Sequence, residues 1–351
     1  MNFGVEIIEW YGEHKRDLPW RNTGDPYPIW LSEIILQQTR VDQGLAYYHR
    51  FIQKYPTVQK LAAATEDDVL KLWQGLGYYS RARNLHQTAK EIVKKYRGIF
   101  PEEHKQILSL KGIGDYTAAA ILSFAFNKKF PVVDGNVFRL LSRYFGIKTP
   151  INSSKAKKEF FLLAGELMED HPPAVFNQAI MEFGARQCKP QNPDCSICQL
   201  NINCVALAQK KVDQFPVKNP KSEIRNRYFN YLVVYQDEKL FLNKRKGNDI
   251  WKNLYDFPVI ETSKRFSEKK IMLGEDWKTL FGKTKVTLKT VSPEYRHLLS
   301  HQTIHAKFYE INLPSKKTFG VKNKFFPVSK KELKKLAVPK LIENFLAKKN
   351  E

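Results

Sequence analysis

The sequence predicts two domains of different fold class, an all-α N-terminal half followed by an α+β C-terminal half. The chain has 351 residues, a length that suits about two domains of ~150 residues each. Apolar residues recur at helical spacing over residues 1–210, and a strand-like pattern replaces it after residue 228. Residues 211–227 contain two prolines, several charges and little periodicity, which is typical of a linker.

The N-terminal half begins with an amphipathic pattern and contains a clear helix start. Phe3, Ile7 and Tyr11 are spaced to share one helix face. Thr65 precedes three carboxylates, a pattern typical of an N-cap followed by acidic residues that oppose the positive end of the helix dipole. Gly75 is expected to lie just beyond the end of this second helix.

The C-terminal half has the composition of a sheet domain with a final helix. Its strand-like runs are rich in β-branched and aromatic residues and cover 228–235, 239–243, 286–291 and 303–311. Residues 333–346 return to helical spacing.

The charge balance favours a polyanionic partner. Lys and Arg number 58 against 36 Asp and Glu, which gives a formal net charge of +22. Such a surplus favours nucleic acid and argues against acidic small-molecule chemistry as the only role, although lysine-rich surfaces also simply keep proteins soluble. Residues 221–351 carry 29 basic and 14 acidic side chains, whereas residues 1–220 carry 29 and 22. Binding to a nucleic acid should weaken steeply as salt rises.

All four cysteines lie in one short segment, which predicts a metal centre in a reducing compartment. Cys188, Cys195, Cys198 and Cys204 have the spacing C-x6-C-x2-C-x5-C. Four thiolates at this spacing can surround one centre, and the spacing does not separate zinc from iron–sulfur. Unpaired structural cysteines are the less favoured alternative. The chain has no apolar run near the ~20 residues of a membrane span, so we expect a soluble intracellular protein.

A glycine-rich turn between two helical stretches predicts a phosphate-binding hairpin. Gly112 and Gly114 flank one aliphatic residue and precede a run of small residues. Amides at such a turn, at a helix N-terminus, can bind a DNA phosphate. The turn alone is a weak signal, since it also occurs at ordinary helix corners. We expect Arg186 and Lys189, beside the cysteines, to lie at the surface and bind DNA phosphates.

Two carboxylates are candidates for acid and electrostatic catalysis. Glu33 is the only charge in the apolar run 30–36, where burial would raise its pKa and suit a general acid. Asp134 follows an apolar segment and is expected at a cavity rim, ionised. Together they would supply an acid and a stabiliser for an oxocarbenium-like transition state. The alternatives are a glutamate on a solvated helix face and an aspartate that only caps a helix.

These motifs together resemble the adenine DNA glycosylase (MutY) family of the helix-hairpin-helix base-excision repair superfamily. The matching segments, beside the cysteines, are SEIILQQT (32–39), GLGYYSRARNL (75–85), LKGIGDYTAAA (110–120), VDGNV (133–137) and FNQAIMEFGA (176–185). The resemblance runs over nearly the whole chain.

The resemblance implies a multidomain architecture. Residues 1–210 would form an all-α helix-hairpin-helix glycosylase core, with a six-helix part at about 21–127 and an iron–sulfur cluster part at about 1–20 and 128–210. Residues 211–227 would be the linker. Residues 228–351 would form an α+β Nudix-like domain that recognises the lesion.

The resemblance also implies the cofactor and the catalytic groups. The four cysteines would hold a 4Fe–4S cluster, and Glu33 would protonate the adenine leaving group. Asp134 would stabilise the oxocarbenium ion or its covalent successor, and Tyr116 and Asn136 would orient the two carboxylates.

The substrate contacts implied by the family fall in three sets. Arg21, Leu36 and Gln178 would line the adenine pocket. Gln38 and Tyr78 would wedge into the duplex beside the orphaned base. The family's Phe-Ser-His loop, which reads 8-oxoguanine, corresponds here to Leu299, Ser300 and His301, with leucine in place of phenylalanine.

The predicted function is therefore that of a monofunctional DNA glycosylase that flips and releases adenine mispaired with 8-oxoguanine or guanine. Related endonuclease III-like enzymes carry a nucleophilic lysine where this chain has Tyr116, so a bifunctional pyrimidine glycosylase/lyase is the weaker alternative. No Nudix motif, with its glutamate-dense magnesium-binding helix, occurs in residues 228–351, which disfavours a pyrophosphohydrolase. A non-catalytic iron–sulfur DNA-binding protein is a further alternative. We expect a monomeric, cytoplasmic, nucleoid-associated bacterial protein with no membrane partner.

Overall fold

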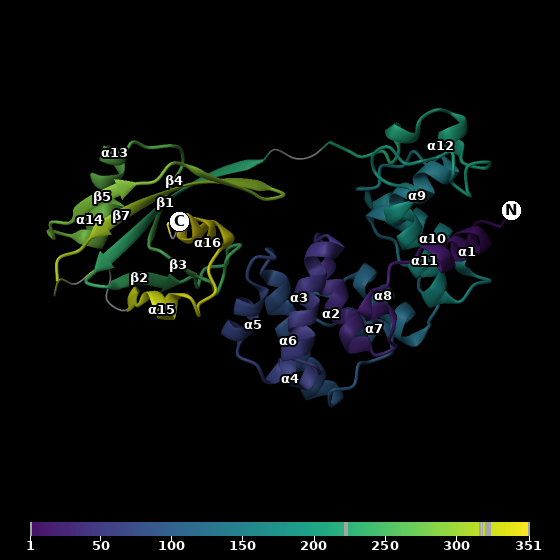
Figure 1. Ribbon diagram of the computed structural model, residues 1–351, viewed down its shortest axis with the longest axis horizontal. Coiled ribbons are helices and arrows are strands. Elements are labelled where there is room, and N and C mark those ends of the chain that lie inside the picture. The colour runs from purple at the N-terminus through teal and green to yellow at the C-terminus, as the bar shows by residue number, and fades with distance from the viewer. Residues whose placement is uncertain (1, 221–223, 316, 318, 320–323, 350–351) are drawn as a thin grey trace. The chain divides into compact units, whose positions relative to one another are not determined.

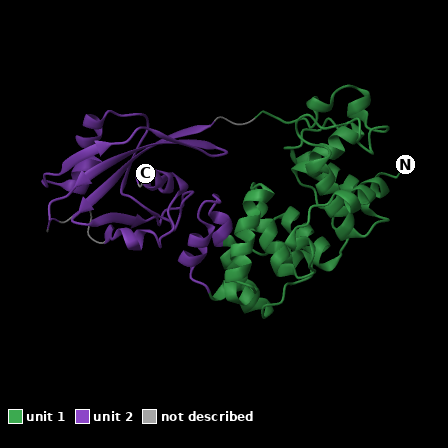
Figure 2. Cartoon of the chain, viewed as in Figure 1, with its two compact units in different colours: residues 1–63, 84–220 green, residues 64–83, 221–351 purple. Residues whose placement is uncertain are grey.

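A computed structural model describes residues 2–220, 224–315, 317, 319 and 324–349. The chain forms two compact units (Figure 2). Unit 1 comprises Met1–Ala63 and Asn84–Pro220, and unit 2 comprises Ala64–Arg83 and Lys221–Glu351. Residues 64–83 therefore group with the C-terminal part of the chain, although the sequence places them inside the helical half. The boundaries at 210 and 228 stay predictions.

Unit 1 is all-α, as predicted (Figure 1). Its helices and helical turns are α1 (Phe3–His14), η1 (Pro19–Arg21), α2 (Pro26–Leu36), α3 (Val41–Lys54), α4 (Val58–Ala63), the larger part of α6 (Ser80–Tyr96), α7 (His104–Leu108), α8 (Asp115–Phe126), α9 (Gly135–Phe145), α10 (Ser154–Met168), α11 (Pro173–Arg186), α12 (Val205–Ala208) and η2 (Val212–Gln214).

Helix α2 lies at the centre of the part of unit 1 that holds the carboxylates. It packs against α3 and α8, and eight of its eleven residues are buried. A helix that is apolar on nearly every side is stable only when other helices surround it, because each buried large aliphatic side chain contributes ~1.5–3 kcal/mol. Its single charged residue, Glu33, is thereby buried in the interior.

The predicted hairpin connects α7 to α8. Gly112 has φ +81°, and a Cβ at this position would lie 2.7 Å from Cβ of Asn84. Glycine is thus required here both for the positive φ and for the close approach of α6. Gly114 is the N-cap of α8, and Thr88 Oγ1 donates a 2.7 Å hydrogen bond to the Lys111 carbonyl, which holds the turn.

Unit 2 contains the predicted sheet. Its strands are β1 (Arg225–Gln236), β2 (Lys239–Lys244), β3 (Tyr255–Asp256), β4 (Val259–Thr262), β5 (Thr287–Val291), β6 (Tyr295–Leu298), β7 (Gln302–Asn312) and β8 (Phe326–Val328). The order along the sheet is β3-β2-β1-β7-β5, with β4 paired to β1, β6 to β7 and β8 to β2. The central strands β1 and β7 are parallel, and the middle residues of β1 are consecutively buried because both faces are covered.

Helices cover the two faces of this sheet. On one face, Leu232 and Tyr309 pack with Ile271 of α13 (Glu268–Met272) and Trp277 of α14 (Glu275–Phe281). On the other, Phe345 of α16 (Lys340–Lys348) stacks on Phe308, with ring centroids 4.0 Å apart.

The helical spacing expected over 333–346 does not correspond to one continuous helix. The structure has two helices there, α15 (Lys330–Leu333) and α16, and Pro339 is the N-cap of the second. Proline lacks the amide hydrogen that an uninterrupted helix would need at this position.

Residues 64–83 join unit 2 through ion pairs and hydrogen bonds. Helix α5 (Glu66–Trp73) has Thr65 as its N-cap, as predicted, with the Thr65 hydroxyl accepting from the Asp68 amide. The Asp67 carboxylate accepts a 2.7 Å hydrogen bond from Lys244 Nζ and a 3.0 Å one from the Tyr255 hydroxyl.

Within the described residues, no helix is both long enough and apolar enough to cross a bilayer.

Candidate active site

Glu33 is buried in the middle of α2, with only 7% of its surface exposed. Burial raises its pKa to about 7, because desolvation disfavours the charged form. The Asp134 carboxylate contributes to this rise, whereas a hydrogen bond with Tyr116 and the positive charge of Arg21 oppose it. The carboxyl group is therefore partly protonated near neutral pH, as a general acid must be.

Asp134 is the N-cap of α9 and is held by three hydrogen bonds. Its Oδ1 accepts from the backbone amides of Asn136 and Val137, both at 2.8 Å, and its Oδ2 accepts from Asn136 Nδ2 at 2.7 Å. Burial raises the pKa of Asp134, and these three bonds together with the charge of Arg139 oppose that rise. Arg139 Nη2 in turn donates to Asn136 Oδ1 at 2.8 Å. The capping alternative for Asp134 and the predicted position at a cavity are thus both realised.

Glu33 and Asp134 line the same cavity, whose volume is about 190 Å³. Tyr116 and Asn136 line it too, and so do the three residues predicted for base binding, Arg21, Leu36 and Gln178. The cavity is somewhat larger than the ~150 Å³ that admits a benzene ring.

Gln178 is fixed by a neighbour from α1. The hydroxyl of Tyr11 donates a 2.6 Å hydrogen bond to Gln178 Oε1. Because the oxygen of the amide is already engaged, its nitrogen is the group left to donate to a bound molecule.

Sequence reasoning missed two charged residues in this wall, Arg16 and Glu182. Glu182 lies one helical turn after Gln178 on α11. Residues spaced i, i+4 share one face of a helix, so this spacing could have predicted that both residues line the same cavity. It also missed Gly184, where a Cβ would lie 2.7 Å from the Asn136 carbonyl oxygen. This glycine lets α11 approach the backbone beside Asp134.

The predicted wedge residues do not line this cavity. Gln38 lies just after the end of α2, is exposed and has φ +55°. Tyr78 belongs to unit 2 and has φ +46°. Both are exposed and in the left-handed region, which non-glycine residues adopt rarely.

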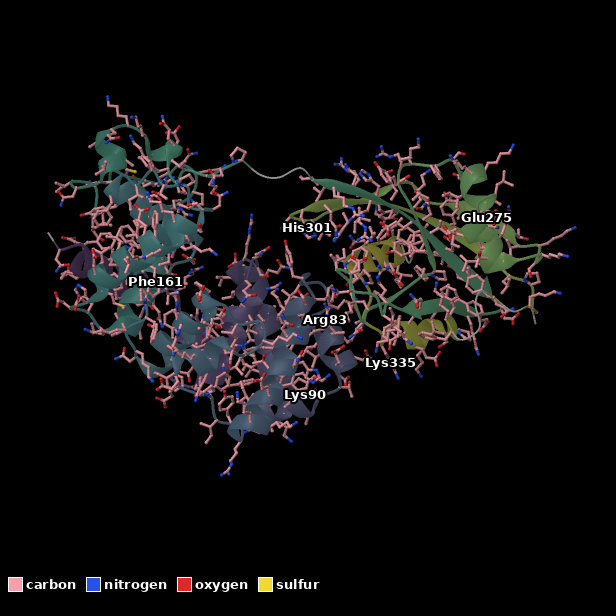
Figure 3. The ribbon with its side chains drawn as sticks, turned by 180° about the vertical axis from the view of Figure 1, so that it is seen from behind. Arg83, Lys90, Phe161, Glu275, His301 and Lys335 are labelled. Carbon is pink, nitrogen blue, oxygen red and sulfur yellow. The ribbon has the colours of Figure 1, made fainter. Side chains whose placement is uncertain are left out.

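Leu299, Ser300 and His301 form the turn between β6 and β7 in unit 2, and His301 lies near the end of this hairpin (Figure 3). The Leu299 amide donates to the Gln302 carbonyl at 2.9 Å, and the His301 carbonyl accepts from the Arg225 amide at 3.2 Å. The Ser300 hydroxyl and the Tyr78 hydroxyl are 2.6 Å apart and hydrogen-bonded. The structure thus brings together one predicted wedge residue and one predicted lesion-reading residue.

The predicted phosphate-binding residues lie at the surface of unit 1. Gly112, Gly114, Arg186 and Lys189 are all exposed. The Arg186 guanidinium donates to the His14 carbonyl, so this side chain is anchored.

The four cysteines are free thiols that line one small cavity of about 30 Å³. Apolar residues such as Leu140 and Leu200 form its wall, and Nη1 of the buried Arg143 lies 3.4 Å from Cys188 Sγ. In the described part of the chain, no three His, Cys, Asp or Glu side chains are arranged to hold a single metal ion. Four thiols around a shared apolar cavity, with a cationic donor beside them, are a donor set that fits a thiolate-ligated metal centre.

Comparison with protein families assigns both halves of the chain. The HhH-GPD superfamily base excision DNA repair protein model matches residues 31–164, and the NUDIX domain model matches residues 230–348. The chain is 35% identical over 356 aligned residues to the adenine DNA glycosylase of Buchnera aphidicola subsp. Acyrthosiphon pisum (strain APS), covering 99% of this chain and 98% of that protein. This chain belongs to the adenine DNA glycosylase family.

A further relative carries the same name, and solved structures share the fold of part of this chain. The adenine DNA glycosylase of Mus musculus is 42% identical over 237 residues, which cover 65% of this chain and 46% of that protein. A thermostable thymine-DNA glycosylase is 32% identical with a TM-score of 0.55, covering 59% of this chain and 95% of that chain. A non-covalent endonuclease III–DNA complex, 21% identical, has a TM-score of 0.51 and covers 59% and 94%, which shows a shared fold.

The family confirms the predicted fold class, a helix-hairpin-helix glycosylase core followed by a Nudix-like domain. It also confirms the prediction of a base excision repair glycosylase, a hydrolase of N-glycosyl bonds.

Proposed function

We propose that this chain is a monofunctional glycosylase that hydrolyses the N-glycosidic bond of adenine mispaired with 8-oxoguanine or guanine in duplex DNA. The observation that carries the proposal is the pair of carboxyl groups, buried Glu33 and half-buried Asp134, in one base-sized cavity. Glu33 has a pKa of about 7 and a tyrosine partner, whereas Asp134 has three hydrogen bonds that favour its ionised form.

Glu33 acts as the general acid. Its carboxyl proton moves to a ring nitrogen of the adenine, and the electron pair of the bond between C1′ and the base leaves with the base. Protonation makes adenine a neutral leaving group, and general acid catalysis of this kind is worth ~10²–10⁴-fold in rate. Tyr116 hydrogen-bonds Glu33, so it sets the direction in which the carboxyl group faces.

Asp134 stabilises the positive charge that develops on the sugar. Breakage of the bond leaves an oxocarbenium ion at C1′. An ionised carboxylate close by either lowers the energy of this ion or forms a covalent bond to C1′ before water attacks. Asn136 fixes the position of this carboxylate, and Arg139 fixes Asn136. Water then forms a bond from its oxygen to C1′, and the proton that it loses passes to the Glu33 carboxylate, which was left ionised by the first step.

Tyr116 also argues against lyase chemistry. A bifunctional glycosylase needs an amine nucleophile that attacks C1′ and forms a Schiff base. The phenol of Tyr116 is instead bonded to Glu33, and burial raises its pKa well above the ordinary value, so the hydroxyl stays protonated.

The adenine must leave the base stack before this chemistry, at a cost of a few kcal/mol. Arg21, Leu36 and Gln178 would contact the flipped base, since all three line the cavity. Gln38 and Tyr78, both exposed, would fill the space that the base vacates.

The turn at Gly112 and Gly114 would bind a backbone phosphate through amides at the start of α8. Exposed Lys189 and the anchored Arg186 would add phosphate contacts. Ser300 and His301 would hydrogen-bond 8-oxoguanine, and Leu299 would supply an apolar contact without the stacking of an aromatic ring.

Cys188, Cys195, Cys198 and Cys204 would hold a 4Fe–4S cluster, supported by their shared cavity and by Arg143. When bound, such a cluster cross-links the segment between α11 and α12. Iron and inorganic sulfide in purified protein support the cluster, and zinc alone contradicts it. The monomeric state and the cytoplasmic, nucleoid-associated location stay predictions.

The test is base release from duplexes that contain adenine opposite 8-oxoguanine, guanine, cytosine or thymine. We expect release from the first two and little from the others, and no adduct when borohydride is added. Release of a pyrimidine, or a strong borohydride-trapped adduct, would support the endonuclease III-like alternative. DNA binding without any base release would support the non-catalytic one.

A further inference from the structure

Glu182 is buried in the wall of the cavity and accepts four hydrogen bonds. Its Oε1 accepts from the Arg16 amide at 3.1 Å and from Arg16 Nε at 2.7 Å. Its Oε2 accepts from Arg16 Nη2 and from Arg21 Nη2, each at 2.7 Å. Only 1% of the Glu182 side chain is exposed, whereas the side chains of its two arginine partners are 33% (Arg16) and 13% (Arg21) exposed, so a buried carboxylate joins two partly accessible guanidinium groups.

This arrangement fixes the segment 16–21 as well as the side chains. Arg21 Nη1 donates to the Arg16 carbonyl at 3.1 Å, which closes the segment on itself. Leu18 and Trp20 are buried between the two arginines along the chain. The guanidinium of Arg21 also lies over the ring of Tyr11, which holds Gln178. A substitution of Glu182 would therefore alter the position of Arg21 and, through it, the residues that would contact the base.

Of the charges in this wall, that of Arg21 acts on Glu33 and lowers its pKa, and Glu182 is hydrogen-bonded to Arg21. Arg16 and Arg21 carry two positive charges, and Glu182 cancels one of them. Burial alone would raise the pKa of Glu182, but the hydrogen bonds from Arg16 and Arg21 outweigh burial and hold this pKa at about 2. Glu182 is thus ionised near neutral pH, and its negative charge always offsets the positive charge of Arg21 there.

We propose that Glu182 is a positioning residue that holds Arg21 against the flipped base and screens the charge of Arg21 from Glu33. Without this carboxylate, the extra positive charge would favour ionised Glu33, and the general acid would lose its proton at lower pH. The proposal deepens the proposed function, since it assigns the residue that sets the pH range of the acid.

The other ionisable groups around Glu33 are few and come from identified elements. Tyr116 on α8, Asp134 at the start of α9, Arg21 on η1, Arg16 before it and Glu182 on α11 line the cavity. Helix α3 contributes only Val41 to this wall. Altering Arg16 and Glu182 therefore changes the charge of the wall while leaving the two catalytic carboxylates and their bonded partners in place.

The test is the pH profile of single-turnover adenine release for wild type, Glu182→Gln, Arg16→Gln, the double variant and Glu182→Asp. We expect the alkaline limb of the profile, where the rate falls, to shift to lower pH by roughly one unit in Glu182→Gln and to higher pH in Arg16→Gln. It should return towards the wild-type position in the double variant, which restores the net charge, and stay near it in Glu182→Asp.

The outcomes separate this proposal from the proposed function. Lower rates in the single variants with an unmoved alkaline limb would overturn the screening role, because a merely structural carboxylate changes the rate without changing the pKa of Glu33. Shifts of the same sign in both single variants would overturn it as well. Absence of adenine release by the wild-type protein would instead contradict the proposed function.

Discussion

The catalytic cavity of unit 1 and the 299–301 turn of unit 2 differ in how their functional side chains are bonded and in how far they are exposed. In the cavity, Glu33, Asp134 and Glu182 are each bonded to other side chains, with Glu33 and Glu182 buried and Asp134 half-buried. In the turn, Ser300 and His301 are exposed, and most of the bonds that define the turn are between backbone groups. Proton transfer needs a fixed pKa and fixed geometry, which burial supplies, whereas recognition groups must stay accessible to DNA. Substitutions should therefore have large effects on rate in the cavity and modest effects on discrimination in the turn.

The largest effect is expected for Glu33→Gln. Glutamine keeps the shape of the side chain but carries no acidic proton, so single-turnover adenine release should fall by ~10²–10⁴-fold while DNA binding is retained. Glu13→Gln on α1 is the matched control, since the Glu13 side chain is 76% exposed and outside the cavity. Release at the wild-type rate by Glu33→Gln would remove the acid role and with it the contrast between the two regions.

An intermediate effect is expected for Asn136→Ala. This change removes the 2.7 Å bond to Asp134 Oδ2, a net loss of about 1 kcal/mol, which corresponds to roughly fivefold in rate. Because that bond lowers the pKa of Asp134, its loss raises this pKa. The acidic limb of the pH–rate profile should move to higher pH, since Asp134 then becomes protonated sooner. A rate loss that is equal at every pH would show that Asn136 acts on something other than the charge of Asp134.

The smallest effect is expected for Leu299→Phe. An aromatic ring at this exposed turn can add ~0.5–1.5 kcal/mol of stacking, which corresponds to about two- to tenfold in the preference for adenine opposite 8-oxoguanine over adenine opposite guanine. The rate of the chemical step itself should not change. The measurement is the ratio of release rates from the two duplexes at limiting enzyme. A change of a hundredfold or more would mean that the turn contributes to catalysis and that the two regions are not separable.

The parts of the site that were predictable lie in short, distinctive segments. Glu33 is conspicuous as a lone charge in an apolar helix, and Asp134 is conspicuous before a glycine at a helix start. Both signals are local, and the structure places both residues in one cavity.

The missed parts depend on long-range packing. Arg16 and Glu182 are 166 positions apart, and a glutamate in a helix gives no local sign that it binds two arginines. The grouping of residues 64–83 with unit 2 rests on pairs such as Asp67 and Lys244, which are equally invisible to periodicity. Pro339 indicates the break before α16, but helical spacing of apolar residues alone does not show where a helix is interrupted.

The pH dependence of single-turnover adenine release from a duplex with adenine opposite 8-oxoguanine tests the central claim most directly. A general acid with a pKa of about 7 must be protonated to act, so the rate should fall as pH rises through about 7. The alkaline limb should disappear in Glu33→Gln, whose residual rate no longer depends on that proton. A wild-type rate that stays constant or increases from pH 6 to 9 would contradict the account, because a buried acid with this pKa would then have no part in releasing the base.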